Sequence, residues 1–223
     1  MDFNAIWHPL FLSFKTVGAS FVLFIVIGIP LAFVLAKENL AHKWLYEALV
    51  TLPLIFPPIA IGFLLLLLLG RNGWIGSYFH QININFIFDF KGLVIAGFIS
   101  GLPLLVKPLQ AAIELFPKAI REAAYVSGKN SVQTFLYIVL PSIQPTVIAA
   151  LLVASARALG EVGITLMLGG NIVGKTDTMS LAIYNAVFDG DYNLALILCA
   201  FLIVISVGIF FALNMMASAK RAL

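Results

Sequence analysis

The chain alternates long apolar runs with short polar stretches. Five stretches are mainly apolar, and they cover residues 16–36, 45–69, 93–113, 146–168 and 194–216. A helix that crosses the hydrocarbon core of a bilayer needs about 20 such residues, and a helix satisfies its own backbone hydrogen bonds there. The pattern therefore predicts an all-α integral membrane protein with about five transmembrane helices. A sixth, shorter helix over residues 179–188 is expected to enter the membrane without crossing it, because Asp189 and Asp191 follow it.

Prolines and glycines modify these helices. Pro53, Pro57 and Pro58 remove backbone donors in the second run and are expected to bend its helix. Residues 163–178, after the fourth run, are rich in glycine and hydroxyl side chains, which favour irregular backbone. Such backbone is tolerated at membrane depth only where it is buried in protein or lines a cavity. This segment is therefore interpreted either as a gate or as an ordinary outward loop.

A polar segment between the third and fourth runs predicts a short helix outside the membrane. Pro117 suits the first helical position, and Gly128 suits the left-handed position that closes a helix. Ile120, Ala123 and Ala124 are expected to share one face, where small side chains let another backbone approach closely. The pattern indicates a docking surface for a second protein.

A second helix is predicted to return the chain to the membrane. Asn130 or Ser131 can cap it. It covers residues 132–140 and is expected to end at Pro141, which cannot continue the hydrogen-bond ladder. The whole polar segment thus occupies residues 114–141.

Basic residues near the run ends predict the orientation, because the cytoplasmic side carries more of them. One side has the larger set: Lys37, Lys43, Lys107, Lys118, Arg121, Lys129, Lys220 and Arg221. The other side has Lys15, Arg71, Lys91 and Lys175. Residues 114–141 and the carboxyl terminus are therefore predicted inside, and the amino terminus outside.

Composition excludes several classes of function. The chain is 62% hydrophobic and 10% charged, and its net charge of +3 is accounted for by the orientation signal, so no nucleic-acid partner is predicted. Cys199 is the single cysteine, and the three histidines lack ligand spacing, so no metal site is predicted. The sequence lacks a glycine-rich phosphate loop followed by Lys and Ser or Thr, so this chain is not expected to hydrolyse ATP by that route.

Two charges occur inside the fourth run. Arg157 and Glu161 are one helical turn apart and lie on one face, at a depth where a single charge is costly. Either Arg157 belongs to an anion pathway that Glu161 tunes, or the two residues neutralise each other and hold helices together. A carboxylate so close weakens the attraction of the arginine for an anion, which favours the second interpretation.

The polar segment resembles a known motif. Glu122, Ala123 and Ala124, then Gly128, then Ile138 and the pair Leu140 and Pro141 have the spacing of the EAA loop of ATP-binding-cassette (ABC) importer permeases. The resemblance implies a type I permease architecture in one domain over residues 1–223. It also implies that residues 114–141 form a coupling loop that docks on a cytoplasmic ATPase, with these residues and Arg121 in that role.

A further resemblance concerns the substrate. The run from Ala156 to Glu161, with Gly163, Thr165, Asn171, Lys175 and the triplet Ala182, Ile183 and Tyr184, is similar to permeases of molybdate and tungstate importers. Sulfate and thiosulfate permeases resemble it more than other ABC systems do. Val173 and Ser180 stand where that family has proline, so the sulfate class remains the alternative. Arg157, Glu161, Thr165, Asn171 and Lys175 are the candidate pathway or gate residues.

The resemblance implies a set of partners. The chain would form a homodimer in the cytoplasmic (inner) membrane of a bacterium or an archaeon, with a pair of cytoplasmic ATPases that bind ATP and Mg²⁺, while this chain holds no cofactor and catalyses no reaction. An external or periplasmic binding protein would deliver the tetrahedral oxyanion. A secondary transporter would need intramembrane sites for a coupling ion, and a membrane-embedded enzyme would need a cluster of His, Asp or Glu. Apart from charges near their ends, the predicted spans offer only Arg157 and Glu161.

Overall fold

The computed structural model describes residues 3–219, and within them the chain is helical, with no strand. This confirms the predicted all-α class; Lys220 and Arg221 of the orientation signal lie outside the described residues. In chain order the elements are α1 (Phe3–Leu23), η1 (Phe24–Gly28), α2 (Ile29–Leu35), α3 (Lys43–Ile55), α4 (Pro58–Leu69), α5 (Gly76–Gln81), α6 (Phe90–Glu114), α7 (Lys118–Val126), α8 (Ser131–Thr134), η2 (Phe135–Val139), α9 (Leu140–Ser142), α10 (Gln144–Leu159), α11 (Gly163–Gly169), α12 (Met179–Phe188) and α13 (Tyr192–Ala219).

Three helical stretches in the described residues are long and apolar enough to cross a membrane: Ala5–Leu35, Phe90–Glu114 and Tyr192–Phe211. They correspond to the first, third and fifth predicted runs. The first begins well before residue 16, because polar side chains in its outer part have partners inside the protein. The Ser13 hydroxyl, for example, accepts the backbone N–H of Met179 at 2.8 Å.

The second and fourth runs are each broken into two helices, whereas each was predicted to form one transmembrane helix, the second of them bent at its prolines. Phe56 is extended between α3 and α4, since two successive prolines withhold amide donors and exclude the helical conformation from the residue before them. Pro53, by contrast, stays inside α3. In the fourth run α10 ends at Leu159, and α11 begins after a three-residue gap.

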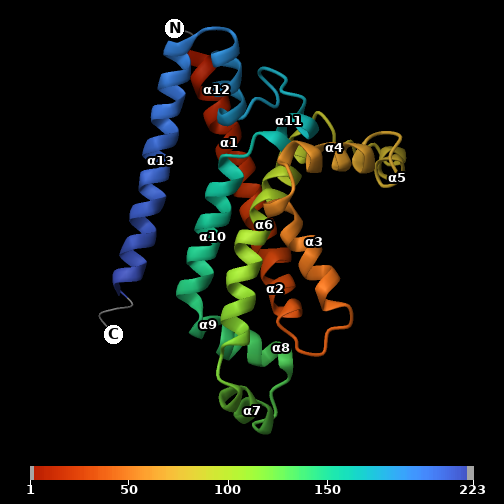
Figure 1. Ribbon diagram of the computed structural model, residues 1–223, viewed down its shortest axis with the longest axis vertical. Helices are drawn as coiled ribbons and strands as arrows, with labels where there is room; N and C mark the ends of the chain where they lie inside the picture. Colours follow the sequence, from red (N-terminus) through yellow and green to blue (C-terminus); the bar gives the residue numbers. More distant parts are fainter. Residues whose placement is uncertain (1–2, 220–223) are drawn as a thin grey trace.

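The second halves of the two broken runs pack against each other. A Cβ atom added at Gly163 would lie 2.8 Å from the backbone nitrogen of Ile59, and one added at Gly62 would lie 2.8 Å from Cβ of Met167. Only glycine permits so close a crossing. Figure 1 shows α4 lying across the long axis of the molecule, beside α11, at the end that also holds the amino terminus.

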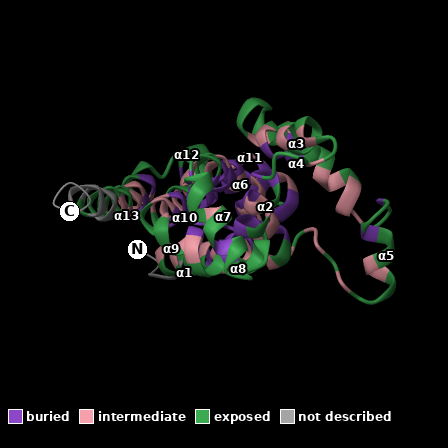
Figure 2. Cartoon of the chain, turned by 90° about the horizontal axis from the view of Figure 1, so that it is seen from below, coloured by how far each residue is buried: buried purple, intermediate pink, exposed green. Residues whose placement is uncertain are grey.

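Helix α6 is the centre of the bundle. It packs against α10, α1 and α2, and its Leu93, Leu105 and Val106 are fully buried. Figure 2 shows this buried centre, with α13 and α5 standing away from it on opposite sides. Because α13 packs only on α12 and α10 among the described elements with substantial contacts, most of its surface is available to lipid or to another chain.

Two π-helical turns, η1 and η2, interrupt the helices, and each stands at the same distance before a proline. Each covers five residues and is followed by one residue and then a proline, Pro30 after η1 and Pro141 after η2. The backbone N–H of Ile29 donates to the carbonyl of Phe24, and that of Leu140 donates to the carbonyl of Phe135. These wide turns let the helix continue past a residue that has no amide donor.

Candidate functional site

The segment predicted to be a coupling loop contains α7, whose ends lie within one residue of the predicted ones. Pro117 is the residue before its first turn, one position earlier than predicted, and Gly128 has φ +82°. The N–H of Lys129 donates to the carbonyl of Ala124 (3.1 Å), and the N–H of Gly128 donates to that of Tyr125 (2.9 Å). This pair of bonds is a Schellman motif, which needs a left-handed residue at the position of Gly128.

The return helix of the loop starts where it was predicted. Of the two candidate caps, Asn130 fills the role, because its side chain accepts the N–H of Gln133 (2.8 Å) while the Gln133 side chain accepts the N–H of Asn130 (3.0 Å). The helix does not end at Pro141, as predicted, but continues through α9 to Ser142. The π-helical turn before the proline removes the need for its missing donor.

The faces of α7 differ in character. Ile120 and Ala123 are exposed, as is Val126, whose exposed fraction is 90%. Ala124 is buried (5% exposed), so of the three residues predicted to share one docking face only Ile120 and Ala123 are exposed, while Ala124, at the edge of that face, packs against its own chain. Figure 1 shows α7 at the far end of the molecule from α4 and α12. An apolar, small-residue face is therefore presented beyond the bundle.

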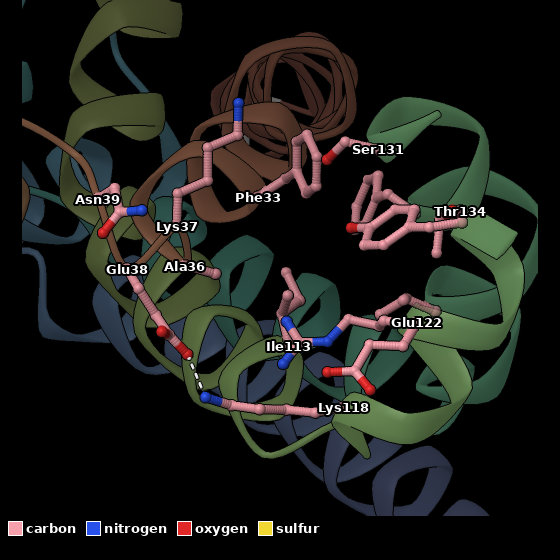
Figure 3. Close-up of a pocket in the computed structure, with 14 residues that line it drawn as sticks. Phe33, Ala36, Lys37, Glu38, Asn39, Ile113, Lys118, Glu122, Ser131 and Thr134 are labelled. Atoms are coloured by element: carbon pink, nitrogen blue, oxygen red, sulfur yellow. Dashed lines mark ion pairs between the residues drawn. The ribbon is translucent and has the colours of Figure 1, made fainter. Parts of the chain in front are cut away.

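The other face of α7 lines a cavity of about 530 Å³ between α7, the end of α2 and the start of the return helix. Figure 3 shows side chains from these elements around it, with Phe33 and Thr134 on one side and Glu122 and Lys118 on the other. At its rim the Lys118 ammonium lies 2.7 Å from the Glu38 carboxylate. The hydrogen bond from Lys118, and then its charge, hold the pKa of Glu38 below its usual range. This ion pair connects the loop after α2 to α7.

Three of the candidate pathway residues come together between α10 and α11. The Arg157 guanidinium lies 2.6 Å from one Glu161 oxygen, and the other oxygen accepts the backbone N–H of Ile164 at 2.8 Å. The Thr165 hydroxyl donates to the Glu161 carbonyl (3.3 Å). The Glu161 side chain is 1% exposed and that of Arg157 is 30% exposed. Both carboxylate oxygens are engaged, which agrees with the interpretation of a mutually neutralising pair.

The other two candidate residues lie apart from that cluster. Asn171 has φ +51° and exchanges side-chain amide hydrogen bonds with Asn185 of α12. Lys175 is exposed. Thr176, in the segment that leads from α11 to α12, is fully buried. Its hydroxyl donates to the carbonyl of Gly169 (2.7 Å) and accepts the N–H of Ile172 (2.8 Å). The segment after α11 is thus held by specific hydrogen bonds, and of the five candidates Lys175 is exposed while Arg157 and Asn171 are partly exposed.

A polar cluster that was not predicted from the sequence lies at the opposite end of the bundle, where α3 begins and α6 ends. Its members are Lys43 and Glu47 of α3 and Lys107, Gln110 and Glu114 of α6. A signal was available, because the members on each helix are spaced three or four residues apart and so share one face. Nothing in that spacing showed that the two faces meet.

This geometry places the chain in a class. An all-helical membrane bundle with broken helices at one end and a short helix beyond the other is the fold of ABC importer permeases. One solved neighbour is a bacterial ABC transporter involved in the import of the acidic polysaccharide alginate (TM-score 0.69, 20% identity, 96% of this chain and 79% of that chain). Another is the MetNI methionine ABC transporter in inward-facing conformations (TM-score 0.68, 17% identity, 96% and 94%).

The chain belongs to the family described as binding-protein-dependent transport system inner membrane component, whose model matches residues 25–221. Its relatives include the molybdenum transport system permease proteins ModB of Haemophilus influenzae, 35% identical over 87% of this chain and 86% of that protein, and of Azotobacter vinelandii, 34% identical over 91% and 90%. The sulfate transport system permease protein CysT of Salmonella typhimurium is 30% identical over 86% and 70%.

Proposed function

We propose that this chain is the permease subunit of an ATP-driven importer for a tetrahedral oxyanion, and that the anion is molybdate, with tungstate as an accepted analogue. Two copies form the translocation pathway in the cytoplasmic membrane. ATP and Mg²⁺ are bound by a pair of separate cytoplasmic ATPases, and a periplasmic or external binding protein delivers the anion. The observation that carries the proposal is membership of the permease family, with molybdenum permeases more similar to this chain than the sulfate permease.

The coupling loop supports the ATPase-driven mechanism. Its apolar outward face, with Ile120 and Ala123, suits a groove on another protein, and the Schellman motif at Gly128 fixes where that face ends. Arg121, Glu122, Leu140 and Pro141 keep the roles that the motif implies, as parts of the docking helix and of its return to the membrane. Ala124 contributes by packing α7 onto its own chain.

Energetics also favour a coupled pump over a channel. Carrying two negative charges inward against a potential of 100 mV costs about 4.6 kcal/mol, at about 2.3 kcal/mol per charge. A passive pore would let the anion leave. ATP-driven closure of the two ATPases provides work of that size through the two α7 helices, and hydrolysis returns the pathway to its inward state.

The candidate pathway residues divide into two roles. Glu161 and Thr165 fasten the start of α11 to the end of α10, and Asn171 fastens the following loop to α12. The partly exposed guanidinium of Arg157 cannot face lipid without a large cost. We assign its exposed edge to the surface shared by the two copies, where the pathway runs.

Uptake of labelled molybdate tests the proposal. Cells that carry the whole transport system are compared with cells that lack only this chain, and uptake is competed with unlabelled tungstate, sulfate and phosphate. We expect uptake that depends on this chain and is blocked by tungstate but not by excess sulfate. Suppression mainly by sulfate would move the chain to the sulfate class, which the CysT similarity makes the second candidate. Uptake that is independent of the chain would refute an importer of these anions.

A further inference from the structure

We propose that Gln110 is a positioning residue that fastens the start of α3 to the end of α6, so that the coupling helix and α3 move as one body. The inference rests on the proposed function in treating α7 as the coupling helix. Glu114 is the last residue of α6, and only three residues separate it from α7. A constraint on the last turns of α6 is therefore a constraint on the root of the coupling loop.

The Gln110 side chain bridges three elements. Its amide nitrogen lies 2.6 Å from the Glu47 carboxylate of α3, 3.0 Å from the Glu114 carboxylate and 3.4 Å from the backbone carbonyl of Leu35, at the end of α2. Gln110 is 5% exposed. Hydrogen bonds to a carboxylate are roughly twice as strong as those between neutral groups, and burial protects these from competition by water.

The ion pairs around Gln110 are weaker fasteners. Lys43 lies 2.8 Å from Glu114, and Lys107 lies 3.8 Å from Glu47, but all four side chains are 28–40% exposed. Exposed pairs of this kind contribute little, because water and salt screen them. The two lysines and two glutamates leave the cluster without net charge, which suits its place at the membrane border. The buried amide is the member that holds the helices together.

Gln110 acts here as a donor alone. All three of its partners are acceptors, while its own carbonyl oxygen is buried and has no partner in the described residues. An amide that uses only its nitrogen can be replaced by an ammonium, which has three donors and no acceptor. This gives the proposal a distinctive signature: lysine should substitute for glutamine at this position, whereas leucine and glutamate should not.

The fastening has a consequence at the other end of α3. Helix α3 leads into α4, and α4 is locked on α11 through the close approach at Gly62 and Gly163. Displacement of α7 by an ATPase would therefore displace α3 through Gln110, and with it the α4 and α11 pair at the outer end. The cluster would link the docking site to the part of the bundle that holds Arg157 and Glu161.

The test uses the assembled transporter, permease with its ATPase, in lipid nanodiscs. Amide hydrogen exchange is measured over residues 118–126 and 43–55 for wild type, Gln110→Lys, Gln110→Leu and Gln110→Glu. Gln81→Leu is the matched control, because Gln81 is exposed in α5 at the far end of the molecule. We expect exchange in both segments to rise about tenfold in the Leu variant, to rise more in the Glu variant, and to stay at the wild-type level in the Lys variant and the control.

The same complexes in proteoliposomes give a functional measurement, the number of anions imported per ATP hydrolysed. This ratio should fall about tenfold in Gln110→Leu and be restored in Gln110→Lys. Wild-type exchange in the Leu and Glu variants, or a Lys variant that behaves like Leu, would overturn the proposal. If the Leu and Glu variants do not assemble, Glu114→Gln replaces them, because it removes a charge but keeps an acceptor. This variant should raise amide exchange in α7 a few-fold. Unchanged exchange would count against the fastening.

Failure of the proposed transport function and failure of the Gln110 fastening give different results. A wild-type complex that hydrolyses ATP but imports none of the tested oxyanions would refute the proposed function, while the hydrogen-exchange comparison would still decide whether Gln110 fastens α3 to the coupling loop. Normal import by wild type together with unchanged exchange in all the Gln110 variants would refute the fastening alone.

Discussion

Gly163→Ala is expected to open the crossing of α4 and α11. The added methyl group would lie 2.8 Å from the Ile59 nitrogen, 2.9 Å from Pro58 Cβ and 3.1 Å from the Pro58 carbonyl carbon. Two of these three atoms are backbone, so the helices must separate. Overpacking of this kind costs about 1–3 kcal/mol, and the better helix propensity of alanine returns less than about 1 kcal/mol. The net loss of about 1–2 kcal/mol corresponds to a fall in Tm of about 2–8 °C for a chain of this size.

Thermal unfolding of the purified permease in lipid nanodiscs measures that fall. Gly208→Ala is the matched control, because the same methyl group in the middle of α13 would meet nothing within 4 Å. Its Tm should equal or exceed that of wild type. A Gly163→Ala variant that unfolds at the wild-type temperature would show that the two helices do not approach as closely as described, and would remove the basis for treating them as one unit.

Three further predictions concern the coupling loop and the charged pair. Gly128→Ala places alanine at φ +82°, which should cost about 1–2 kcal/mol of conformational free energy. Less ATPase should therefore copurify with this variant than with Gly128→Asn. Equal yields of ATPase would count against a role for the Schellman motif. Arg157→Ala leaves the buried Glu161 unpaired and should cost about 3–5 kcal/mol in stability. The yield of detergent-solubilised dimer should therefore be low, and adding Glu161→Gln to the same chain should restore it. Normal yield with lost uptake would assign Arg157 to the anion path instead. The lowered pKa of Glu38 means that its contact with Lys118 is present at neutral pH and is lost only as pH falls through that lowered pKa. Exchange in α7, corrected for its intrinsic pH dependence, should therefore match at pH 6 and pH 8, and Glu38→Gln should change it by less than about twofold, because both side chains of the pair are exposed; a difference between the two pH values in wild type would contradict this.

The sequence indicated the membrane helices because hydropathy along a chain reports where it meets lipid. It also indicated the short helix α7 and the helix that follows it, since Pro117, Gly128 and Asn130 act through local backbone geometry. The breaks in the second and fourth runs were harder to foresee. Pro57 and Pro58 were visible, but whether a proline bends a helix or ends it depends on what the next segment packs against, and here that is α11.

The candidate sites show the same division between local and tertiary information. The pairing of Arg157 with Glu161 follows from helical spacing and was foreseen as one of two alternatives. The engagement of Glu161 with the N–H of Ile164 was not, because it exists only once α10 has ended. Gln110 gave no signal by itself, since its importance comes from carboxylates and a carbonyl on three helical elements that the fold brings together.

The two π-helical turns affect how this chain tolerates changes in length. One residue added to an α-helix rotates everything after it by about 100°, which would turn a protein-facing side toward lipid. A π-turn accommodates one additional residue, so the helix after it keeps the same side toward the protein core. Deletion of a single residue within η1 should therefore remove the additional residue and leave Ala32 and Leu35 buried where they are. The same deletion in the middle of α6, which has no such turn, would turn its buried side chains out of the core.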